Sequence, residues 1–298
     1  MWIADGWKDY EVLDCSDGEK LERWGDYILV RPDPQVIWDT PKKNNGWKKN
    51  NGHYHRSRSG GGEWEFHDLP KEWCISYELS PAGQTLNFNL KPFAFKHTGI
   101  FPEQAANWEW CSAIIKKAVQ SSTERPKVLN LFAYTGGATI AAAASGAFVT
   151  HVDAAKGMTG WAKENALSSD IPGDRIRWIV DDCMKFVEKE IRRGKTYDAI
   201  LMDPPSYGRG PDGEIWKIEE AVYPLIKKAA SLLSEKPLFF LVNSYTTGLQ
   251  PGVLSYMLDT ALVSEHGGRV ESDELGLPVK GSKTLALPCG ACGRWIPG

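Results

Sequence analysis

Five short apolar runs alternate with helical patterns through the last two-thirds of the chain, and this alternation constrains the fold most. Each run has four or five residues, a length typical of strands rather than helices. Continuous apolar strands separated by helices indicate a parallel sheet covered on both faces. The expected strands are 128–132, 148–152, 176–180, 199–202 and 238–242, and the expected helices are 103–120, 138–145, 156–168, 183–193, 215–234 and 250–265.

The first third of the chain has a different character. Between residues 10 and 90, short aromatic or β-branched segments lie between Gly, Pro and Asn residues, which predicts a small antiparallel β unit. The length of 298 residues fits one catalytic domain with a small accessory domain. We therefore expect an accessory domain at 1–95 and a catalytic domain at 96–298. The expected strands of the accessory domain are 27–30, 36–38, 73–77 and 86–90.

Charge limits the partners of the whole molecule. The net charge is -3, so a polyanion has to be bound by a local basic surface rather than by bulk attraction. Segment 41–62 contains basic residues and no acidic residue. It is either a solvated loop or a basic finger that contacts phosphates and bases. The residues in question are Lys42, Lys43, Lys48, Lys49, Arg56 and Arg58, with Trp47, His53 and Tyr54 available for stacking or hydrogen bonding.

Cysteine usage and the termini suggest a reduced compartment. Only Cys289 and Cys292 form a close pair, and a second pair for a four-ligand zinc site is missing. We expect reduced thiols, no bound metal and a cytoplasmic location. The first residues do not resemble a secretory signal, and no apolar stretch reaches membrane-spanning length, so we expect no membrane association.

Ligands of parallel sheets bind beyond the carboxyl ends of the strands, so the residues after each strand are the candidates for chemistry. The first strand is followed by a loop that ends in Gly136 and Gly137, where a ligand can approach the backbone and the next helix N-terminus. The G-x-G-x-x-G order of a dinucleotide fold is absent. A turn needed only for packing is the alternative interpretation of this loop.

Acidic residues follow the next two strands. Asp153 comes directly after the second strand, where a carboxylate can accept hydrogen bonds from ribose hydroxyls. Asp182, with Asp181 as the alternative, follows the third strand and can accept a hydrogen bond from an adenine amino group. For these residues helix capping is the competing interpretation.

The strongest signal follows the fourth strand, in the sequence Asp203-Pro204-Pro205-Ser206-Tyr207. Each proline fixes φ and removes a backbone donor. The pair therefore holds the backbone rigid, with its carbonyls free, just after a polar side chain. This arrangement suits a planar acceptor held beside a reactive group, and a simple strand stop is the alternative.

Taken in order, these segments resemble the motifs of class I S-adenosylmethionine-dependent methyltransferases. They are similar, more narrowly, to the bacterial large-subunit ribosomal RNA methyltransferase group, which contains cytosine-C5 and guanine-N7 enzymes. The stretch 96–104 resembles the segment that leads into the catalytic domain of that group, although Glu103 stands where the group has aspartate and Ala105 where it has arginine. The segments that carry the resemblance are 130–136, Asp153, 163–166, 181–182 and 203–205.

The resemblance implies a Rossmann-like, doubly wound sheet of seven strands with S-adenosylmethionine as methyl donor. Asp203, Pro204, Ser206 and Tyr207 are then expected to face the methyl acceptor. The residues expected at the cofactor are Phe132, Ala133, Tyr134, Thr135, Gly136, Asp153, Ala154, Asn165, Asp182, Cys183 and Asp203, with Lys96 and Gln104 at the mouth of the site.

The acceptor is the less determined part of the prediction. A cytosine-C5 enzyme needs a thiolate nucleophile. Ser206 stands where that cysteine is common, and Cys289 or Cys292 replaces it only if the fold brings one there. A nitrogen of an RNA base, ribosomal RNA above all, is therefore the favoured acceptor. A methyltransferase for a small molecule or protein is the alternative, and a nicotinamide-dependent oxidoreductase is a remote one.

Overall fold

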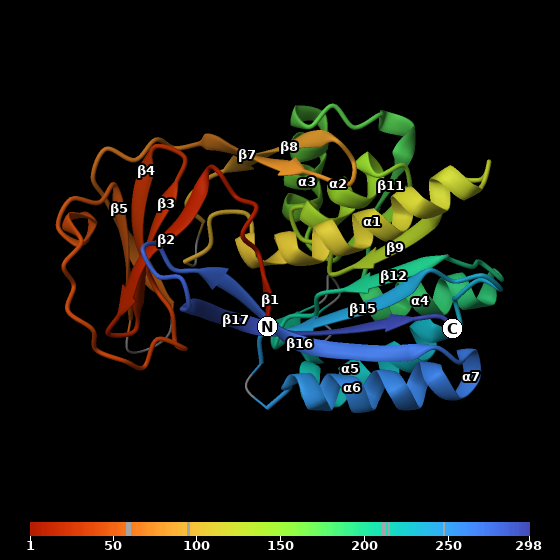
Figure 1. The fold of residues 1–298 in the computed structure, drawn as a ribbon. Helices are drawn as coiled ribbons and strands as arrows, with labels where there is room; N and C mark the ends of the chain where they lie inside the picture. The colour runs from red at the N-terminus through yellow and green to blue at the C-terminus, as the bar shows by residue number, and fades with distance from the viewer. Residues whose placement is uncertain (58–60, 94–95, 210–212, 214, 247) are drawn as a thin grey trace.

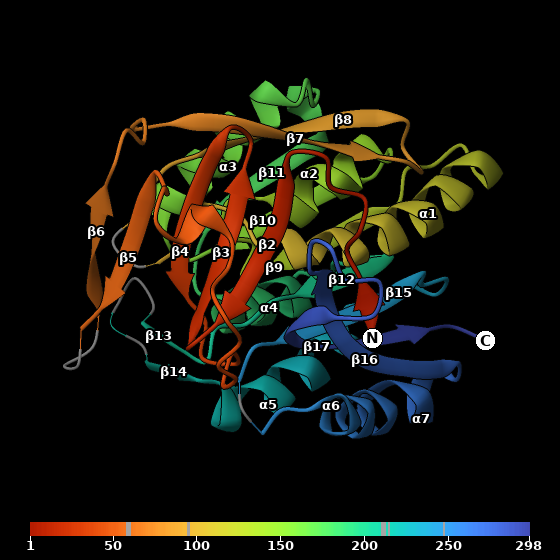
Figure 2. The same ribbon diagram turned by 60° about the vertical axis from the view of Figure 1, so that its left-hand side comes forward.

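The computed structural model describes residues 1–298 except 58–60, 94–95, 210–212, 214 and 247. An α/β part holds a large central sheet, and a β-rich part built from the N-terminal residues lies beside it (Figure 1). Turning the molecule brings the N-terminal β sheet in front of the central sheet (Figure 2). The isolated bridge between Val12 and Val279, just after the end of β16, places the β-rich part beyond the carboxyl ends of the parallel strands.

The central sheet has eight strands in the order β1-β16-β17-β15-β12-β9-β10-β11. The five expected strands are parallel neighbours, and β17 runs antiparallel to both β15 and β16. The predicted doubly wound α/β fold is confirmed, with one strand beyond the expected seven because residues 2–3 pair with the edge strand β16. The strands are β1 (Trp2–Ile3), β9 (Lys127–Leu131), β10 (Phe148–Asp153), β11 (Ile176–Val180), β12 (Ala199–Met202), β15 (Phe239–Ser244), β16 (Arg269–Pro278) and β17 (Ala286–Ile296).

Helices cover both faces of this sheet, which explains why every residue of β12 and of β15 is buried. The first three residues of the expected helix 215–234 instead form β14, which pairs with β13. One face carries α1 (Ala105–Ser121), α2 (Gly137–Ala144) and α3 (Lys156–Ser168). The other face carries α4 (Cys183–Arg192), α5 (Ile218–Ala230) and α6 (Pro251–Leu258). Helix α6 leads through the π-helical turn Asp259–Val263 into α7 (Ser264–His266). The strands of the short hairpin are β13 (Tyr207–Arg209) and β14 (Ile215–Lys217).

The N-terminal part contains the expected antiparallel β unit, a five-stranded sheet in the order β2-β3-β4-β5-β6 in which only β4 and β5 are parallel. A separate hairpin, β7–β8, packs on α3. The predicted strand at 36–38 is wrong: its carbonyls meet only the turn at Asp17 and Gly18. The strands are β2 (Tyr10–Ser16), β3 (Glu19–Trp24), β4 (Tyr27–Pro32), β5 (Gly52–Arg56), β6 (Gly62–Phe66), β7 (Trp73–Leu79) and β8 (Gln84–Leu90).

The described residues of segment 41–62 pack against this sheet, to which they contribute β5, and do not form a free finger. The indole of Trp47 donates to Asp14, and Tyr54 is buried against Trp64. Lys42 pairs with Glu19 at 2.7 Å. Lys43, Lys48 and Lys49 remain exposed, whereas Arg58 lies outside the described residues.

All six cysteines are free thiols in the structure, as expected. None of the helices formed by the described residues is long and apolar enough to cross a membrane.

Candidate functional site

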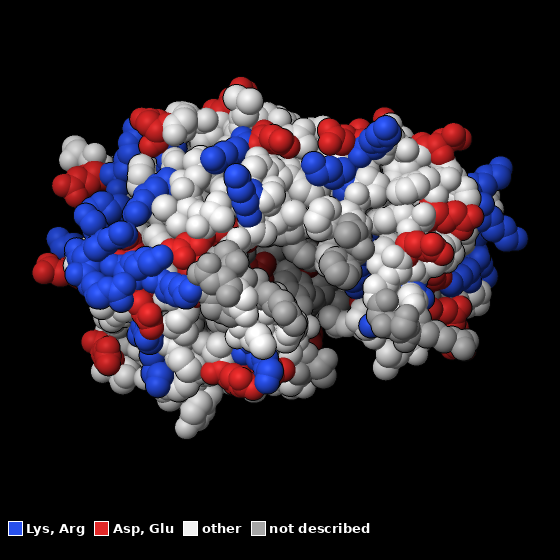
Figure 3. All heavy atoms as spheres, turned by 180° about the vertical axis from the view of Figure 1, so that it is seen from behind, with Lys and Arg blue, Asp and Glu red and all other residues white. Residues whose placement is uncertain are grey.

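A cavity of about 420 Å³ opens at the carboxyl ends of β9, β10 and β12, facing the N-terminal part. Seen from behind, the molecule is hollowed between its two parts (Figure 3). Three aspartates line the cavity together with several aromatic rings. The lining consists of His97, Phe101, Phe132, Tyr134, Asp153, Ala154, Ala155, Asp182, Cys183, Asp203, Pro204, Pro205, Gly208, Trp216 and Tyr245.

The loop after β9 reaches the cavity through an unusual backbone path. Phe132 and Tyr134 both have left-handed conformations, with φ of 55° and 51°, and Gly136 follows with φ of 85°. Such conformations are disfavoured for residues with a side chain and persist only when surrounding contacts hold them. Backbone N–H groups do this here, because Ala133 donates to the Val152 carbonyl and Phe132 to the Cys183 sulfur. The strained loop is therefore fixed against β10 and α4.

Asp153 ends β10 at the wall of the cavity. Its two carboxylate oxygens accept from the backbone N–H groups of Tyr134 and Ala155, each at 2.8 Å. Burial raises the pKa of Asp153, and these two hydrogen bonds oppose the rise. The residue before α3 is Ala155, so Asp153 is not the N-cap of that helix. Its carboxylate is instead held rigidly at the cavity lining, and each oxygen keeps a second lone pair that can accept from a hydroxyl donor.

Asp182 and Asp181 have different surroundings. Asp182 lines the cavity and caps α4, because its Oδ1 accepts from the Lys185 N–H at 2.9 Å. Asp181 is bound to Lys189 at 2.5 Å and is absent from the lining. Asp182, rather than Asp181, is therefore the acid that faces a ligand, and capping and ligand contact are compatible because the cap uses one oxygen.

Asp203 lies on the floor of the cavity with one oxygen unsatisfied. Its Oδ1 is buried and has no hydrogen-bond partner among the described residues. Burial, and secondly the nearby carboxyl of Glu103, raise the pKa of Asp203 to about 7. A carboxyl with that pKa exchanges its proton near neutral pH, as a general base does.

The two prolines after Asp203 shape the adjoining wall. Pro204 is buried, and the Pro205 carbonyl accepts from the indole N–H of Trp216 at 2.6 Å. The Trp216 ring lies 4.8 Å from the Phe132 ring at a tilt of 56°. These flat surfaces suit a planar group.

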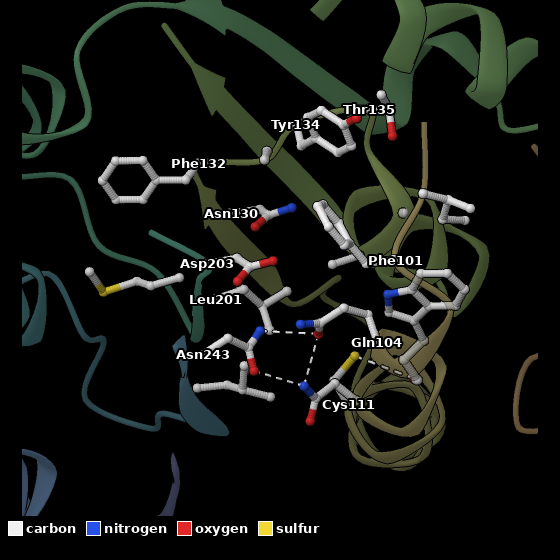
Figure 4. A pocket seen from close by; sticks show the side chains of 18 residues that line it. Phe101, Gln104, Cys111, Asn130, Phe132, Tyr134, Thr135, Leu201, Asp203 and Asn243 are labelled. Carbon is white, nitrogen blue, oxygen red and sulfur yellow. Dashed lines mark hydrogen bonds between the residues drawn. The ribbon is translucent and has the colours of Figure 1, made fainter. Parts of the chain in front are cut away.

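A smaller cavity of about 50 Å³ continues from the floor between β9, β15 and α1. Figure 4 shows the amides of Gln104 and Asn243 meeting there, with Asp203 directly beside them. Asn107 donates to the side-chain oxygens of both amides at 2.9 Å, and Arg294 donates to the Asn107 oxygen at 2.6 Å. This buried amide network fixes the floor of the site.

Most of the predicted residues are brought together. Phe132, Tyr134, Asp153, Ala154, Asp182, Cys183, Asp203 and Pro204 line the larger cavity, and Gln104, Ala133 and Thr135 line the smaller one. The remaining five predicted residues, which lie outside both linings, are Lys96, Gly136, Asn165, Ser206 and Tyr207.

Two of those five support the site from behind. Asn165 is buried, donates to the Thr135 carbonyl at 3.0 Å and accepts from the Asn89 N–H at 2.8 Å. Gly136 sits where a Cβ would meet the Cβ of Ala162 at 2.9 Å. Both keep the loop after β9 packed on α3 and the β7–β8 hairpin.

The other three point elsewhere. The Lys96 ammonium donates to the Pro32 carbonyl, and burial lowers its pKa to about 8. Ser206 contacts the hydroxyl of Thr246. Tyr207 is exposed on β13. These residues were predicted because their motifs lie near the site, but a motif does not determine where each side chain points.

Besides Ala155, sequence reasoning missed four ring-bearing side chains that line the cavity: His97, Phe101, Trp216 and Tyr245. A signal existed for two of them, because His97 and Phe101 lie in the 96–104 segment of the family resemblance. Tyr245 follows the fifth parallel strand, and ligands of parallel sheets bind beyond the carboxyl ends of the strands, so this position also carries a signal. Trp216 has no comparable signal because its position depends on the hairpin β13–β14.

The cysteines do not offer a thiolate. Cys183 is the only one of the six in the lining of the larger cavity, and burial raises its pKa well above the usual value. Cys111 lines the smaller cavity, and burial raises its pKa to about 12. Burial likewise raises the pKa of Cys292 to about 12, and Cys292 and Cys289 lie on β17 outside both linings. A covalent route through a cysteine finds no support in this arrangement.

Comparison with known proteins agrees with this geometry. A family model described as S-adenosylmethionine-dependent methyltransferase matches residues 70–217. The structure of a SAM-dependent methyltransferase from Agrobacterium tumefaciens is 36% identical, with a TM-score of 0.89, and the match covers 99% of this chain and 92% of that one. A structure from Streptococcus mutans is 18% identical with a TM-score of 0.71, covering 98% of this chain and 76% of that one, and shows the fold alone.

Among curated sequences, the ribosomal RNA large subunit methyltransferase K/L of Magnetococcus marinus is 31% identical over 178 residues. That match covers 58% of this chain and 23% of the relative. The chain therefore spans less than a quarter of the length of this relative.

Proposed function

The chain belongs to the S-adenosylmethionine-dependent methyltransferase family, and from this premise we propose that it methylates a nitrogen of an RNA base, with ribosomal RNA as the substrate class. The observation that carries the proposal is the half-buried carboxyl of Asp203, whose Oδ1 finds no partner in the described part of the chain and which two prolines follow at the floor of the cavity. The names of the ribosomal relatives support the choice of RNA.

The cofactor of the family is S-adenosylmethionine, and the cavity has groups that fit it. Besides Asp203 Oδ1, the buried hydroxyl of Tyr134 has no partner among the described residues. Buried polar atoms are rarely left without a partner, so both indicate a polar ligand. We assign Asp153 to the ribose hydroxyls, Asp182 to the adenine amino group, and the 132–136 loop to the methionine part.

Held by Asp153, Asp182 and the 132–136 loop, S-adenosylmethionine would supply an electrophilic sulfonium methyl group, and S-adenosylhomocysteine would be the leaving group when an amine nitrogen attacks in line. The protein has to hold the acceptor close, aligned and free of water. The rigid Pro204-Pro205 backbone and the tilted rings of Phe132 and Trp216 are suited to hold a planar base. Asp203 orients the amine by accepting its N–H, and takes the proton that the nitrogen releases.

The N-terminal part completes the proposal. Its five-stranded sheet stands across the hollow from the cavity, so we propose that residues 1–95, apart from β1 and from the hairpin β7–β8 that packs on α3, form an accessory domain that holds RNA against residues 96–298. Exposed Lys43, Lys48 and Lys49 are the basic groups it offers for phosphates. We also propose a cytoplasmic location.

Transfer of tritiated methyl groups tests the substrate class. Ribosomal RNA, transfer RNA and protein extract, each from cells that lack the enzyme, are incubated with the chain and labelled S-adenosylmethionine. We expect label in ribosomal RNA, and none with the Asp203→Asn variant. Label confined to the protein fraction or to small molecules would overturn the RNA proposal, and leave the family assignment intact.

A further inference from the structure

Three of the six histidines gather on one face of the outer hairpin formed by β5 and β6, away from the cavity. His53 and His55 are two residues apart on β5, so their side chains share a face. Glu65 pairs with His53 across the hairpin and therefore lies on the same face. His67, two residues beyond Glu65, reaches it at 3.3 Å.

The spacing of these side chains is that of a metal-binding group. One potential ligand atom from each of His53, His55 and Glu65 lies within 4.8 Å of the other two. Ligands around a tetrahedral zinc ion, at about 2.0–2.1 Å from it, lie roughly 3.4 Å apart, so small side-chain rotations close the set. The two imidazole rings already stand 3.9 Å apart, and the His55 Nε2 lies 2.8 Å from a Glu65 oxygen.

We propose that His53, His55 and Glu65 bind one divalent transition-metal ion, and that Zn²⁺ is the ion this set fits. Two imidazoles with one carboxylate are a known zinc donor set, and they leave the fourth position to water. Imidazole ligands favour zinc, copper or nickel over magnesium or calcium, which prefer oxygen donors. The exposed side chains of His55 and Glu65 leave the ion an open path from solvent.

Neighbouring groups already hold two of the ligands in place. Glu19 contacts the Nε2 of His53 at 2.7 Å, and Lys42 contacts the other Glu19 oxygen at 2.7 Å. On the far side, His67 contacts the second oxygen of Glu65. Groups that hydrogen-bond to metal ligands orient them and typically strengthen binding about 10- to 100-fold.

The ion would cross-link an otherwise weakly held strand. β6 is at the edge of the five-stranded sheet, and most of its residues are exposed. The same strand carries Trp64, whose indole donates to the Phe93 carbonyl at 3.1 Å. The Phe93 N–H in turn donates to the carbonyl of His97 at 3.1 Å, and His97 lines the cavity, so fixing β6 would also restrain one edge of the cavity.

Titration of the untagged, metal-free chain with Zn²⁺ by calorimetry tests the site. We expect one ion per chain and a melting temperature that rises with Zn²⁺ and falls back with a chelator, since a ligand of the native state stabilises it. His55→Ala and Glu65→Gln should weaken binding at least tenfold. Because both side chains are exposed, these variants should melt like the wild type without zinc.

His266→Gln, a histidine on α7 in the other part of the molecule, is the matched control and should bind Zn²⁺ unchanged. His67→Ala tests whether His67 only supports the ligand Glu65. Because His67 is not one of the three proposed ligands, its loss should weaken Zn²⁺ binding less than His55→Ala does. Absence of stoichiometric binding, or equal binding by the wild type and by both His55→Ala and Glu65→Gln, would overturn the proposal. Methyl transfer is not needed for this measurement, so failure here is distinct from failure of the proposed function.

Discussion

Tyr134 donates its backbone N–H to the carboxylate of Asp153 at 2.8 Å, and this bond joins the loop after β9 to the end of β10. Two parts of the proposed cofactor site are thereby coupled, because the residue assigned to the ribose also holds the strained loop assigned to the methionine part. The second Asp153 oxygen accepts from Ala155 and fixes the start of α3. Loss of this carboxylate is therefore expected to affect binding at more than one point.

Replacement of Asp153 tests this coupling. Wild-type protein with S-adenosylhomocysteine at about 100 times Kd should gain about 2.7 kcal/mol of stability, visible as a raised melting temperature. Asp153→Ala should abolish that rise, since it removes the ribose acceptor and releases the loop. The exposed acid Asp174 gives a matched control, and Asp174→Ala should keep the full rise. A full rise in Asp153→Ala would refute the ribose assignment.

The pKa of Asp203 predicts how stability depends on pH. Burial raises this pKa from an ordinary 3.8 to about 7, so the folded state binds the proton more tightly than the unfolded chain does. That stabilisation is fully present below about pH 4 and is lost as pH rises through 7. Asp203→Asn, which stays uncharged, should therefore be more stable than wild type at pH 8 by about 1–3 kcal/mol, with no such gain at pH 4.

Urea unfolding at the two pH values measures this difference. The same residue should give opposite results for stability and for activity, because the uncharged amide cannot take a proton. Methyl transfer by the wild type should rise with pH around 7 and should be lost in Asp203→Asn at every pH. An equally active variant would show that the Asp203 carboxyl does not accept the proton. A variant that is no more stable than wild type at pH 8 would show that burial does not raise the pKa of this carboxyl.

The strand ends could be predicted from sequence because the pattern of a parallel sheet fixes which residues come after each strand. Asp153, Asp182 and Asp203 were found in this way, and all three line the same cavity. The sequence could not predict whether a side chain near the site points into the cavity or away from it. Asn165 and Lys96 lie near the site in the fold, but their polar atoms bond to neighbouring backbone.

Long-range contacts explain the other differences. β1 has two residues, too few for any periodic signal, and becomes a strand only because β16 offers a free edge. Segment 36–38 has β-branched and aromatic residues, but its backbone carbonyls accept from the turn after β2 rather than from a neighbouring strand. Trp216 enters the cavity because its indole bonds to Pro205. No local pattern encodes such pairings.

Asn165 is expected to position the loop rather than to contact the cofactor. Its amide joins the Thr135 carbonyl to the Asn89 N–H, and Asn165→Ala would leave both backbone groups unpaired at a cost of about 1–3 kcal/mol each. Unfolding free energy should fall, and cofactor binding should weaken through the displaced loop. Asn165→Asp keeps the oxygen acceptor and should retain the bond to Asn89 alone. Equal cofactor affinity in wild type and Asn165→Ala would exclude a positioning role.

Gly99 is the position where a single added methyl group should be most harmful to the site. Its φ of 116° is one that residues with a side chain rarely adopt, and an added Cβ would lie 2.4 Å from the ring of Trp161. That ring is anchored because its indole donates to the Asn89 carbonyl at 2.7 Å. Gly99→Ala should therefore shift the backbone of residue 99, whose carbonyl accepts from the Thr135 hydroxyl beside the smaller cavity.

We expect Gly99→Ala to lower the unfolding free energy by about 2–4 kcal/mol and to weaken binding of S-adenosylhomocysteine. Gly157→Ala is the matched control, because Gly157 lies in α3 with open space around its Cα. There the same added methyl group should raise stability by about 0.5–1 kcal/mol, since alanine favours the helix more than glycine does. Denaturant unfolding of both variants measures the two changes. If they had the same sign, the contact between residue 99 and Trp161 would not be what fixes this edge of the site.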